Sequence, residues 1–218
     1  MSDLLLSAAE ARVLASLVEK SIATPQYYPM TVNALMLAAN QKTMRHPVMS
    51  LSEGEVGAAL NRLETLELVS RDDRSGRVTK WRHQFQHQLL LQPPALAVLV
   101  TLMLRGPQTA AELRANAAPL GGPAEIEALR ALLADLADRA QPLVQTLPRA
   151  AGQSAVRYAH TLCGACAPAE EPEPARPAPA PAPAPTASEL AELRARLQAL
   201  EARVAELEAR LAPAQPGS

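Results

Sequence analysis

The stretch LVSRDDRSGRVTKW, Leu68–Trp81, decides the fold of this chain, because two runs of strand-forming residues flank a short polar turn. Alternating side chains of this kind are typical of β-strands, and the Asp, Arg, Ser and Gly between them are typical of a tight turn. A β-hairpin is therefore predicted. Four cations lie on or beside its turn: Arg74, Arg77, Lys80 and Arg82.

A helix is predicted directly before this hairpin. Ser52 and Glu55 have the spacing of a capping box, and Leu51 and Val56 have the spacing of a hydrophobic staple. The expected core stripe is Val56, Ala59, Leu60 and Leu63. The expected outward face is Gly54, Ala58, Asn61 and Thr65. This outward face is small and uncharged. Two interpretations stay open: a partner that approaches it closely, or an exposed face with no partner.

The same plan occurs twice along the chain. ARVLASLVEK (11–20) matches LAVLVTLMLR (96–105) in apolar spacing, and TVNALMLAAN (31–40) parallels TAAELRANAA (109–118), each opening on a threonine suited to an N-cap. GRVTKW (76–81) parallels QSAVRY (153–158). Each copy therefore reads as three helices followed by a hairpin, which is the winged-helix variant of helix-turn-helix. We expect a mainly α fold with small β-hairpins (α+β), with tandem winged-helix domains at residues 1–91 and 92–162.

The last quarter of the chain has a different composition. Residues 163–187 are rich in Pro and Ala, which predicts an extended linker. In the segment 188–211, apolar side chains recur at alternating spacings of three and four positions, which predicts a coiled coil. A disordered tail is predicted at 212–218. The predicted coiled-coil seam is Leu190, Leu193, Leu197, Leu200, Val204, Leu207 and Leu211.

Charge favours a parallel pairing of two such coils. In a parallel pair Arg196 faces Glu201 of the other copy, whereas an antiparallel pair sets Arg196 against Arg203. A homodimer through this segment is therefore expected. The alternative is a single helix held by its own ion pairs, because three heptads are marginal.

Composition limits the classes of function. The 218 residues carry a net charge of −1, with +1 in residues 1–88, +1 in residues 89–160 and −3 in the remainder. No strong field therefore draws the chain to nucleic acid or to an anionic membrane. Aromatic residues make up 2%, which argues against the stacking platforms used on single strands. With no signal-peptide pattern and no apolar run long enough for a membrane span, a cytoplasmic protein is expected.

Several segments of the two copies resemble a known family. PQYYPMTVNAL (25–35), NQKTMRHPVMSLSEGEV (40–56), GRVTKW and LRGPQTAAELR (104–114) are similar to the YceH-like family of uncharacterised bacterial proteins. The resemblance covers residues 6–160. It implies two winged-helix domains in tandem, often with a C-terminal helical tail. No catalytic or ligand residues come with it.

Three groups of residues in the first copy are candidates for contact with duplex DNA. The hairpin cations named above suit phosphates, and the segment between the second and third helices suits the DNA backbone or bases. The candidates in that segment are Asn40, Gln41, Lys42, Arg45 and His46. The candidates on the third helix are Asn61, Arg62 and Thr65. The alternatives are a solvated hairpin whose Asp72 and Asp73 partly cancel the cations, and a loop held by its own side-chain-to-backbone bonds.

The second copy points away from DNA. Its third helix is expected to bury Ile126, Leu129, Leu133 and Leu136 and to expose Ala124, Glu127, Ala128, Ala131, Asp135 and Asp138. Carboxylates on that face repel phosphates, so this copy is expected to meet protein or solvent. The chain is therefore interpreted as a DNA-binding, regulator-like protein that acts through its first copy. The alternative is a protein–protein adaptor without nucleic-acid binding.

Metal and catalytic chemistry have little support in the sequence. His160, Cys163 and Cys166 are weak candidates for half of a zinc site or for a redox pair, but a structural zinc needs four ligands. Two unrelated linker cysteines are the competing interpretation. The four histidines have no evident nucleophile or carboxylate partner in the sequence, so no cofactor and no enzymatic activity are expected.

Overall fold

Helix α1, Ala8–Ala23, lies at the centre of the first copy in the computed structural model, which describes residues 4–72, 78–148, 155–164, 198 and 202–203. Ser7 caps the helix, and the Glu10 side chain bonds back to the cap. Every residue from Ala11 to Glu19 is buried. A helix enclosed on all sides belongs to the interior of a domain, so α1 is the element on which the others assemble.

The remaining elements of the first copy follow the predicted order. They are η1 (Pro25–Tyr27), α2 (Val32–Ala39), α3 (Glu53–Thr65), β1 (Val69–Asp72), β2 (Lys80–His83) and the short α4 (Phe85–Gln88). The capping box of Ser52 and Glu55 is present, and the four predicted core residues of α3 are buried. Strands β1 and β2 pair antiparallel, with Val69 opposite His83. The predicted helix leading into a hairpin is confirmed.

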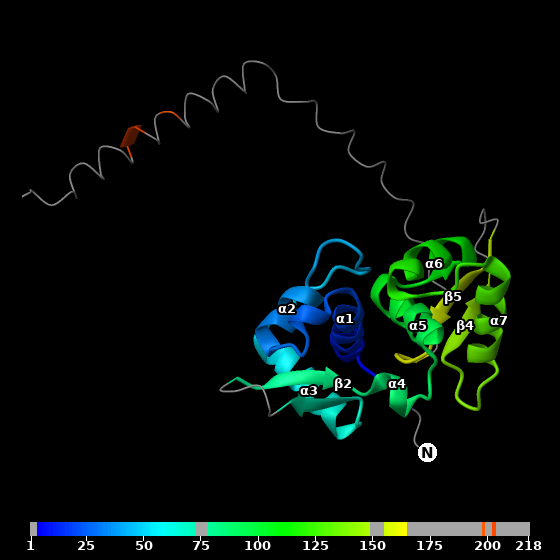
Figure 1. Cartoon of the computed structure of the whole chain (residues 1–218), viewed down its shortest axis with the longest axis horizontal. Coiled ribbons are helices and arrows are strands. Elements are labelled where there is room, and N and C mark those ends of the chain that lie inside the picture. The colour runs from blue at the N-terminus through cyan, green and yellow to red at the C-terminus, as the bar shows by residue number, and fades with distance from the viewer. Residues whose placement is uncertain (1–3, 73–77, 149–154, 165–197, 199–201, 204–218) are drawn as a thin grey trace, which may run out of the picture. The chain divides into compact units, whose positions relative to one another are not determined.

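The second copy repeats this order with one more strand. Its elements are α5 (Pro93–Arg105), β3 (Gln108–Thr109), α6 (Ala110–Ala117), η3 (Ala118–Leu120), α7 (Ile126–Ala137), β4 (Val144–Leu147) and β5 (Arg157–His160). The sheet order is β3-β5-β4, and both pairings are antiparallel. Both expected threonine caps, at the starts of α2 and α6, are present. The fold is a mixed helix-and-strand arrangement with small antiparallel sheets (Figure 1).

Each copy also has a short strand segment that was not predicted. Met30 exchanges two backbone hydrogen bonds with Trp81, at 3.2 and 2.8 Å, immediately before α2. In the second copy Gln108 pairs with Tyr158 at the equivalent place before α6. The return strand of each hairpin is therefore tied to the start of the second helix.

The two copies share one hydrophobic core. Helices α1 and α5 pack against each other, and every residue from Ala95 to Leu104 on α5 is buried (Figure 1). Backbone bonds cross between the copies, from His46 N to Leu104 O and from Leu6 N to Leu162 O. Residues 1–169 form a single compact unit. The predicted domain boundary between residues 91 and 92 therefore lies inside one body.

Residues 170–218 form a second unit. The predicted linker lies almost wholly outside the described residues, which include only positions 163 and 164 of it, and all seven seam residues of the predicted coiled coil lie outside them as well. Within this unit the described residues are Gln198, Ala202 and Arg203, which are helical and exposed. Among all residues that the structure describes, no helix has both the length and the apolar character needed to cross a bilayer.

Candidate nucleic-acid interface

Arg45, predicted to contact DNA phosphate, is buried instead. Its side chain has no exposed surface and forms a two-point ion pair with Glu19 of α1, at 3.1 Å from Nη1 to Oε1 and 2.6 Å from Nη2 to Oε2. It also donates to the carbonyls of Ala38 and Met44. Since none of its charge reaches the surface, Arg45 is withdrawn from the candidate interface.

A second arginine, Arg12 of α1, also bonds to the end of α2 and to the loop that follows it. Its Nη1 donates to Ala39 O at 3.3 Å and its Nη2 donates to Pro47 O at 2.7 Å. The last carbonyls of an α-helix have no partner within the helix and carry partial negative charge. Arg12 and Arg45 therefore cap the C-terminus of α2 from inside the protein.

The loop between α2 and α3 is held by its own side chains. The amide of Asn40 donates to Leu51 O at 2.7 Å and accepts from Leu51 N at 2.8 Å. Gln41 Oε1 accepts from Arg45 Nη2 at 3.1 Å and from Lys20 Nζ at 3.4 Å. These are bonds of the kind that the capped-loop interpretation requires. The Asn40 amide and the amide oxygen of Gln41 are engaged within the fold, which leaves fewer groups to contact bases.

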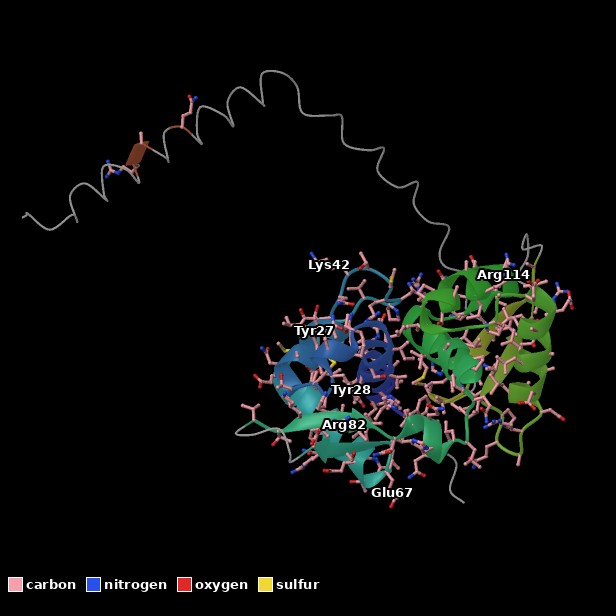
Figure 2. The ribbon with its side chains drawn as sticks, in the orientation of Figure 1. Tyr27, Tyr28, Lys42, Glu67, Arg82 and Arg114 are labelled. Atoms are coloured by element: carbon pink, nitrogen blue, oxygen red, sulfur yellow. The ribbon has the colours of Figure 1, made fainter. Side chains whose placement is uncertain are left out.

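Lys42 and His46 are the candidates from this loop that stay exposed. Figure 2 places Lys42 on the loop, away from the α1 core. The backbone N–H of His46 donates to Leu104 O, so the loop is also anchored to the second copy at this residue. The loop is a fixed surface with one exposed ammonium group rather than a cluster of cations.

Of the four candidate cations of the hairpin, Lys80 and Arg82 are described, whereas Arg74 and Arg77 lie outside the described residues. Arg82 Nε donates to Asp72 Oδ2 at 2.7 Å, across the two strands, and the guanidinium lies 5.5 Å from the centre of the Tyr28 ring. Figure 2 shows Tyr28 and Arg82 close to each other on this side of the first copy. Asp72 therefore neutralises much of the field of Arg82 at this face.

The outward face of α3 is open, as predicted. Asn61, Arg62 and Thr65 are exposed, and a Cβ atom built on Gly54 or Gly57 meets nothing within 4 Å. No described part of the chain therefore needs those glycines for close approach. The helix carries three glutamates and one arginine, a net charge of −2, which opposes phosphate.

Arg71 is a cation at this face that the sequence did not single out. It forms an ion pair with Glu64 at 3.0 Å, donates to Asn61 Oδ1 at 3.2 Å, and lies 5.1 Å from the centre of the Trp81 ring. Arg71 is the register partner of Trp81 on the neighbouring strand, so the two side chains lie on the same face of the hairpin. Asn61 is consequently engaged with Arg71 and is not simply presented to solvent.

Large apolar side chains are exposed on the first copy. Between residues 8 and 160, those more than a third exposed and described by the structure are Ile22, Tyr27, Leu37, Met44, Val48, Val78 and Leu90. None of them belongs to the second copy, residues 93–160. Leu37 lies on α2 and is 63% exposed, whereas the matched position on α6 is an alanine. Exposed apolar surface of this kind is typical of contact with another protein.

Buried imidazoles remain neutral at physiological pH. Burial lowers the pKa of His83 to about 4, with the neighbouring His87 adding to the effect, and burial likewise lowers the pKa of His160 to about 4. Ring nitrogen Nε2 of His83 lies 3.1 Å from Ser21 Oγ. Burial also raises the pKa of Tyr28, whose hydroxyl oxygen accepts from His83 N at 2.8 Å. Neither histidine therefore adds positive charge to the candidate interface.

The weak metal candidates are not brought together by the described residues. His160 and Cys163 both line one pocket, but the Cys163 thiol donates to Ser7 O at 3.8 Å, and Cys166 lies outside the described residues. Among the residues that are described, no group of three or more His, Cys, Asp and Glu has a geometry suited to a metal ion.

Helix α7 of the second copy has the predicted faces. Leu129, Leu133 and Leu136 are buried and Ile126 is half-buried. The six residues predicted to face outward are all exposed. Its surface is therefore one of alanines and carboxylates, with Arg130 paired to Glu127 at 2.9 Å.

Comparison with known proteins gives a family without an assigned activity. The model of the family described as "Protein of unknown function, DUF480" matches residues 6–153. A UPF0502 protein of Geobacter sulfurreducens is 45% identical over 162 residues, 74% of each chain. A UPF0502 protein of Burkholderia vietnamiensis is 51% identical over 155 residues, 71% of this chain and 65% of that protein. The chain belongs to the DUF480 (UPF0502) family of bacterial proteins.

Proposed function

We propose that this chain is a non-enzymatic, cytoplasmic protein of tandem winged-helix type whose first copy binds a protein partner. The winged-helix assignment is supported by the order of three helices and a hairpin in both copies, with a short third strand segment before each second helix. A fold of this kind does not by itself indicate whether the partner is DNA or protein. The choice of partner rests on the surface of the first copy.

The difference between the two copies in exposed apolar surface carries this proposal. Both copies have the same order of three helices and a hairpin, yet Tyr27, Leu37, Met44 and Val48 are each more than half exposed and have no large apolar counterpart among the exposed residues described in the second copy. Isolated exposed apolar residues are ordinary on protein surfaces. Four of them on η1, α2 and the following loop are harder to explain without a partner, because the loop that carries two of them is held in place by buried arginines.

Charge indicates the chemistry of that partner. Helix α3 begins five residues after Val48 and has a net charge of −2. A partner segment that combines apolar side chains with lysines or arginines complements both features. Two of the cations nominated for DNA are neutralised within the fold, since Arg45 is paired with Glu19 and Arg82 with Asp72. The adaptor interpretation therefore accounts for more of the described surface than the DNA interpretation.

Site-specific photo-crosslinking in cells tests this proposal. A crosslinking residue placed at Leu37 is expected to capture a discrete partner, whereas the same residue at Ala115, the matched position on α6, is expected to capture none. Glu53→Lys, on the exposed start of α3, is expected to weaken the capture. Equal crosslinking from both positions, or capture unaffected by the charge reversal, contradicts the proposal.

Duplex DNA is the second candidate partner, favoured by the hairpin. Lys80 is partly exposed beside the turn, and Arg74 and Arg77 precede it in the sequence. If these three cations contact phosphates, log K falls with log salt at a slope of about −2.7, so binding weakens roughly forty-fold between 50 and 200 mM salt. Arg82 is left out of this set because its loss leaves Asp72 without its cation.

Retention of random duplex DNA at low salt separates the two candidates. The adaptor predicts no retention. A DNA-binding protein predicts retention that is abolished by replacing Arg74, Arg77 and Lys80 together with Ala, and that Lys42→Ala reduces less. Retention unchanged in the triple variant moves the DNA site away from the hairpin.

Self-association through residues 188–211 is proposed separately. Sedimentation of the full chain and of a chain ending at Ala167 tests it, because that cut removes the heptads and leaves the folded unit nearly whole. We expect a dimer and a monomer respectively. A dimer of the shortened chain places the interface in the two folded copies instead.

A further inference from the structure

Met44, on the α2–α3 loop, is an exposed methionine with an unusual backbone conformation. The residue is 58% exposed, and its φ is +58°, in the left-handed region. Residues other than glycine, asparagine and aspartate rarely adopt that region, because their Cβ atom approaches the backbone too closely. Met44 therefore combines a strained backbone with an apolar side chain that is left in water.

Helix termination does not explain this conformation. The other non-glycine residues with a positive φ in the described part of the chain are Glu67 and Leu90, and each directly follows the C-cap of a helix, α3 or α4. A left-handed residue is common there because it satisfies the last carbonyls of the helix. Met44 lies four residues beyond Asn40, the C-cap of α2. Its φ belongs instead to the bend that turns the Arg45 side chain inward.

The bend fixes the backbone of Met44 without using its side chain. Arg45 Nη1 donates to Met44 O at 3.1 Å, and the next residue along, His46, donates its N–H to Leu104 O at 2.8 Å. A glycine at position 44 would make the same bend without the steric cost. Met44 also belongs neither to the hydrophobic core nor to the half-buried side chains packed on it. The fold therefore does not require a methionine at this position, which points to a contact outside the fold.

Exposure also distinguishes Met44 from the other described methionines in its chemistry. Met30 and Met103 are 5% exposed, and Met36 and Met49 are half-buried. An accessible thioether reacts with hydrogen peroxide to give a sulfoxide. One peroxide oxygen is transferred to the sulfur, the O–O bond breaks, and the other oxygen leaves as water, so the sulfur is oxidised by two electrons and the peroxide is reduced. Met44 is therefore expected to be oxidised before the other four.

We propose that Met44 is an oxidation site that controls the partner-binding surface: the thioether packs against the partner, and the sulfoxide prevents that packing. The proposal rests on the function proposed above, in which Met44 joins Tyr27, Leu37 and Val48 in contacting the apolar side chains of a basic partner segment. A sulfoxide places a polar S=O group where that contact is apolar, and burying it without a hydrogen-bond partner is unfavourable. Loss of one buried methionine contact weakens binding roughly tenfold or more.

Oxidation at Met44 is expected to leave the fold intact. The side chain lies mostly in water, and the bond that holds its backbone is made by the carbonyl oxygen and not by the sulfur. The competing interpretation is a passive surface methionine, whose oxidation changes neither stability nor partner binding. Binding and stability must therefore be measured on the same oxidised sample.

The experiment treats the purified full chain, carrying a crosslinking residue at Leu37, with hydrogen peroxide and removes the peroxide before cell extract is added. Peptide mass spectrometry is expected to find the sulfoxide at Met44 before Met36 or Met49. At that stage the oxidised chain is expected to capture the same discrete partner roughly tenfold less than the untreated chain. The urea midpoint followed by Trp81 emission is expected to stay unchanged. Equally fast oxidation of Met36 or Met49, or a lowered midpoint, overturns the proposal.

Matched variants separate the sulfur of Met44 from other oxidised groups. Met44→Leu keeps an apolar side chain without a thioether, so it is expected to retain capture and to make capture insensitive to peroxide. Met44→Gln resembles the sulfoxide in size and polarity and is expected to reduce capture roughly tenfold without any oxidant, at an unchanged urea midpoint. Met36→Leu, the control, is expected to keep the full response to peroxide.

The outcomes also separate this proposal from the function on which it rests. Capture from Leu37 that neither peroxide nor Met44→Gln reduces overturns the oxidation site and leaves the partner surface standing. A peroxide response that persists in Met44→Leu likewise assigns the effect to another residue. Absence of capture from the untreated chain overturns both.

Discussion

Replacing Arg45 with Met is expected to destabilise the fold strongly. Met fills much of the same volume but removes six hydrogen bonds, two of them to the Glu19 carboxylate. That carboxylate is only 11% exposed and would stay in a largely dry site without its cation. Breaking one side of a buried ion pair costs about 3–5 kcal/mol. Lys20 Nζ lies 3.7 Å from Glu19 Oε2 and compensates in part, which favours the lower end, about 3 kcal/mol.

The double variant Glu19→Met with Arg45→Met separates the ion pair from its surroundings. With both charges removed, the remaining losses are the bonds to Ala38 O, Met44 O and Gln41 Oε1. These four bonds, two of them to Ala38 O, are worth about 2–6 kcal/mol at about 0.5–1.5 kcal/mol each, and the apolar contacts of the two methionines offset part of that loss. The double variant is therefore expected to be more stable than Arg45→Met alone, as is typical when a whole buried pair is exchanged for apolar side chains.

Urea unfolding followed by tryptophan fluorescence measures these changes. Trp81 is the one tryptophan of the chain and is buried in the first copy, so its emission reports the unfolding of this region. A loss of about 3 kcal/mol corresponds to a Tm lower by about 6–12 °C for a unit of this size. A loss below about 1 kcal/mol in Arg45→Met, or a double variant as unstable as the sum of the singles, refutes the reasoning.

Three further predictions concern stability. His83 and His160 have pKa values of about 4 in the folded state, so below pH 6.5 the unfolded chain binds more protons than the folded chain. The free energy of unfolding is therefore highest above pH 6.5 and falls towards pH 4, by about 2 kcal/mol for each histidine at pH 5. Urea midpoints measured against pH check this, and a flat profile contradicts it. Gly57→Ala is expected to stabilise the fold by about 0.5–1 kcal/mol in the same assay, since its added methyl group meets only open space; a loss of stability would mean that the α3 face is covered. Asn40→Ala removes both bonds to Leu51 and is expected to cost about 1–2 kcal/mol, and an unchanged midpoint would show that the loop is held without it.

Local patterns in the sequence predicted the elements well. The capping box of Ser52 and Glu55, the staple of Leu51 and Val56 and the apolar spacing that follows all act within a few residues, so their geometry follows from helix periodicity alone. The repeat of the same pattern further along supported the order of elements in both copies. These signals need no knowledge of how distant segments meet.

The roles of charged loop residues depended on those distant contacts. Nothing near Arg45 in the sequence distinguishes an arginine that faces DNA from one that reaches Glu19, which is 26 residues earlier. A signal was present on α1, where Arg12, Ser16 and Glu19 form one polar stripe on the otherwise apolar segment Ala11–Glu19. That stripe indicates that some polar segment covers the helix, but it does not identify the α2–α3 loop as the segment.

The packing of α1 against α5 has a consequence for how this duplicated chain can vary. Each central helix buries part of the other from solvent. A bulkier side chain on one helix must therefore be matched by a smaller side chain opposite it on the other. The halves are thus constrained to change together, although their outer surfaces remain independent. A chain cut between Leu91 and Gln92 would expose the apolar faces that α1 and α5 bury against each other.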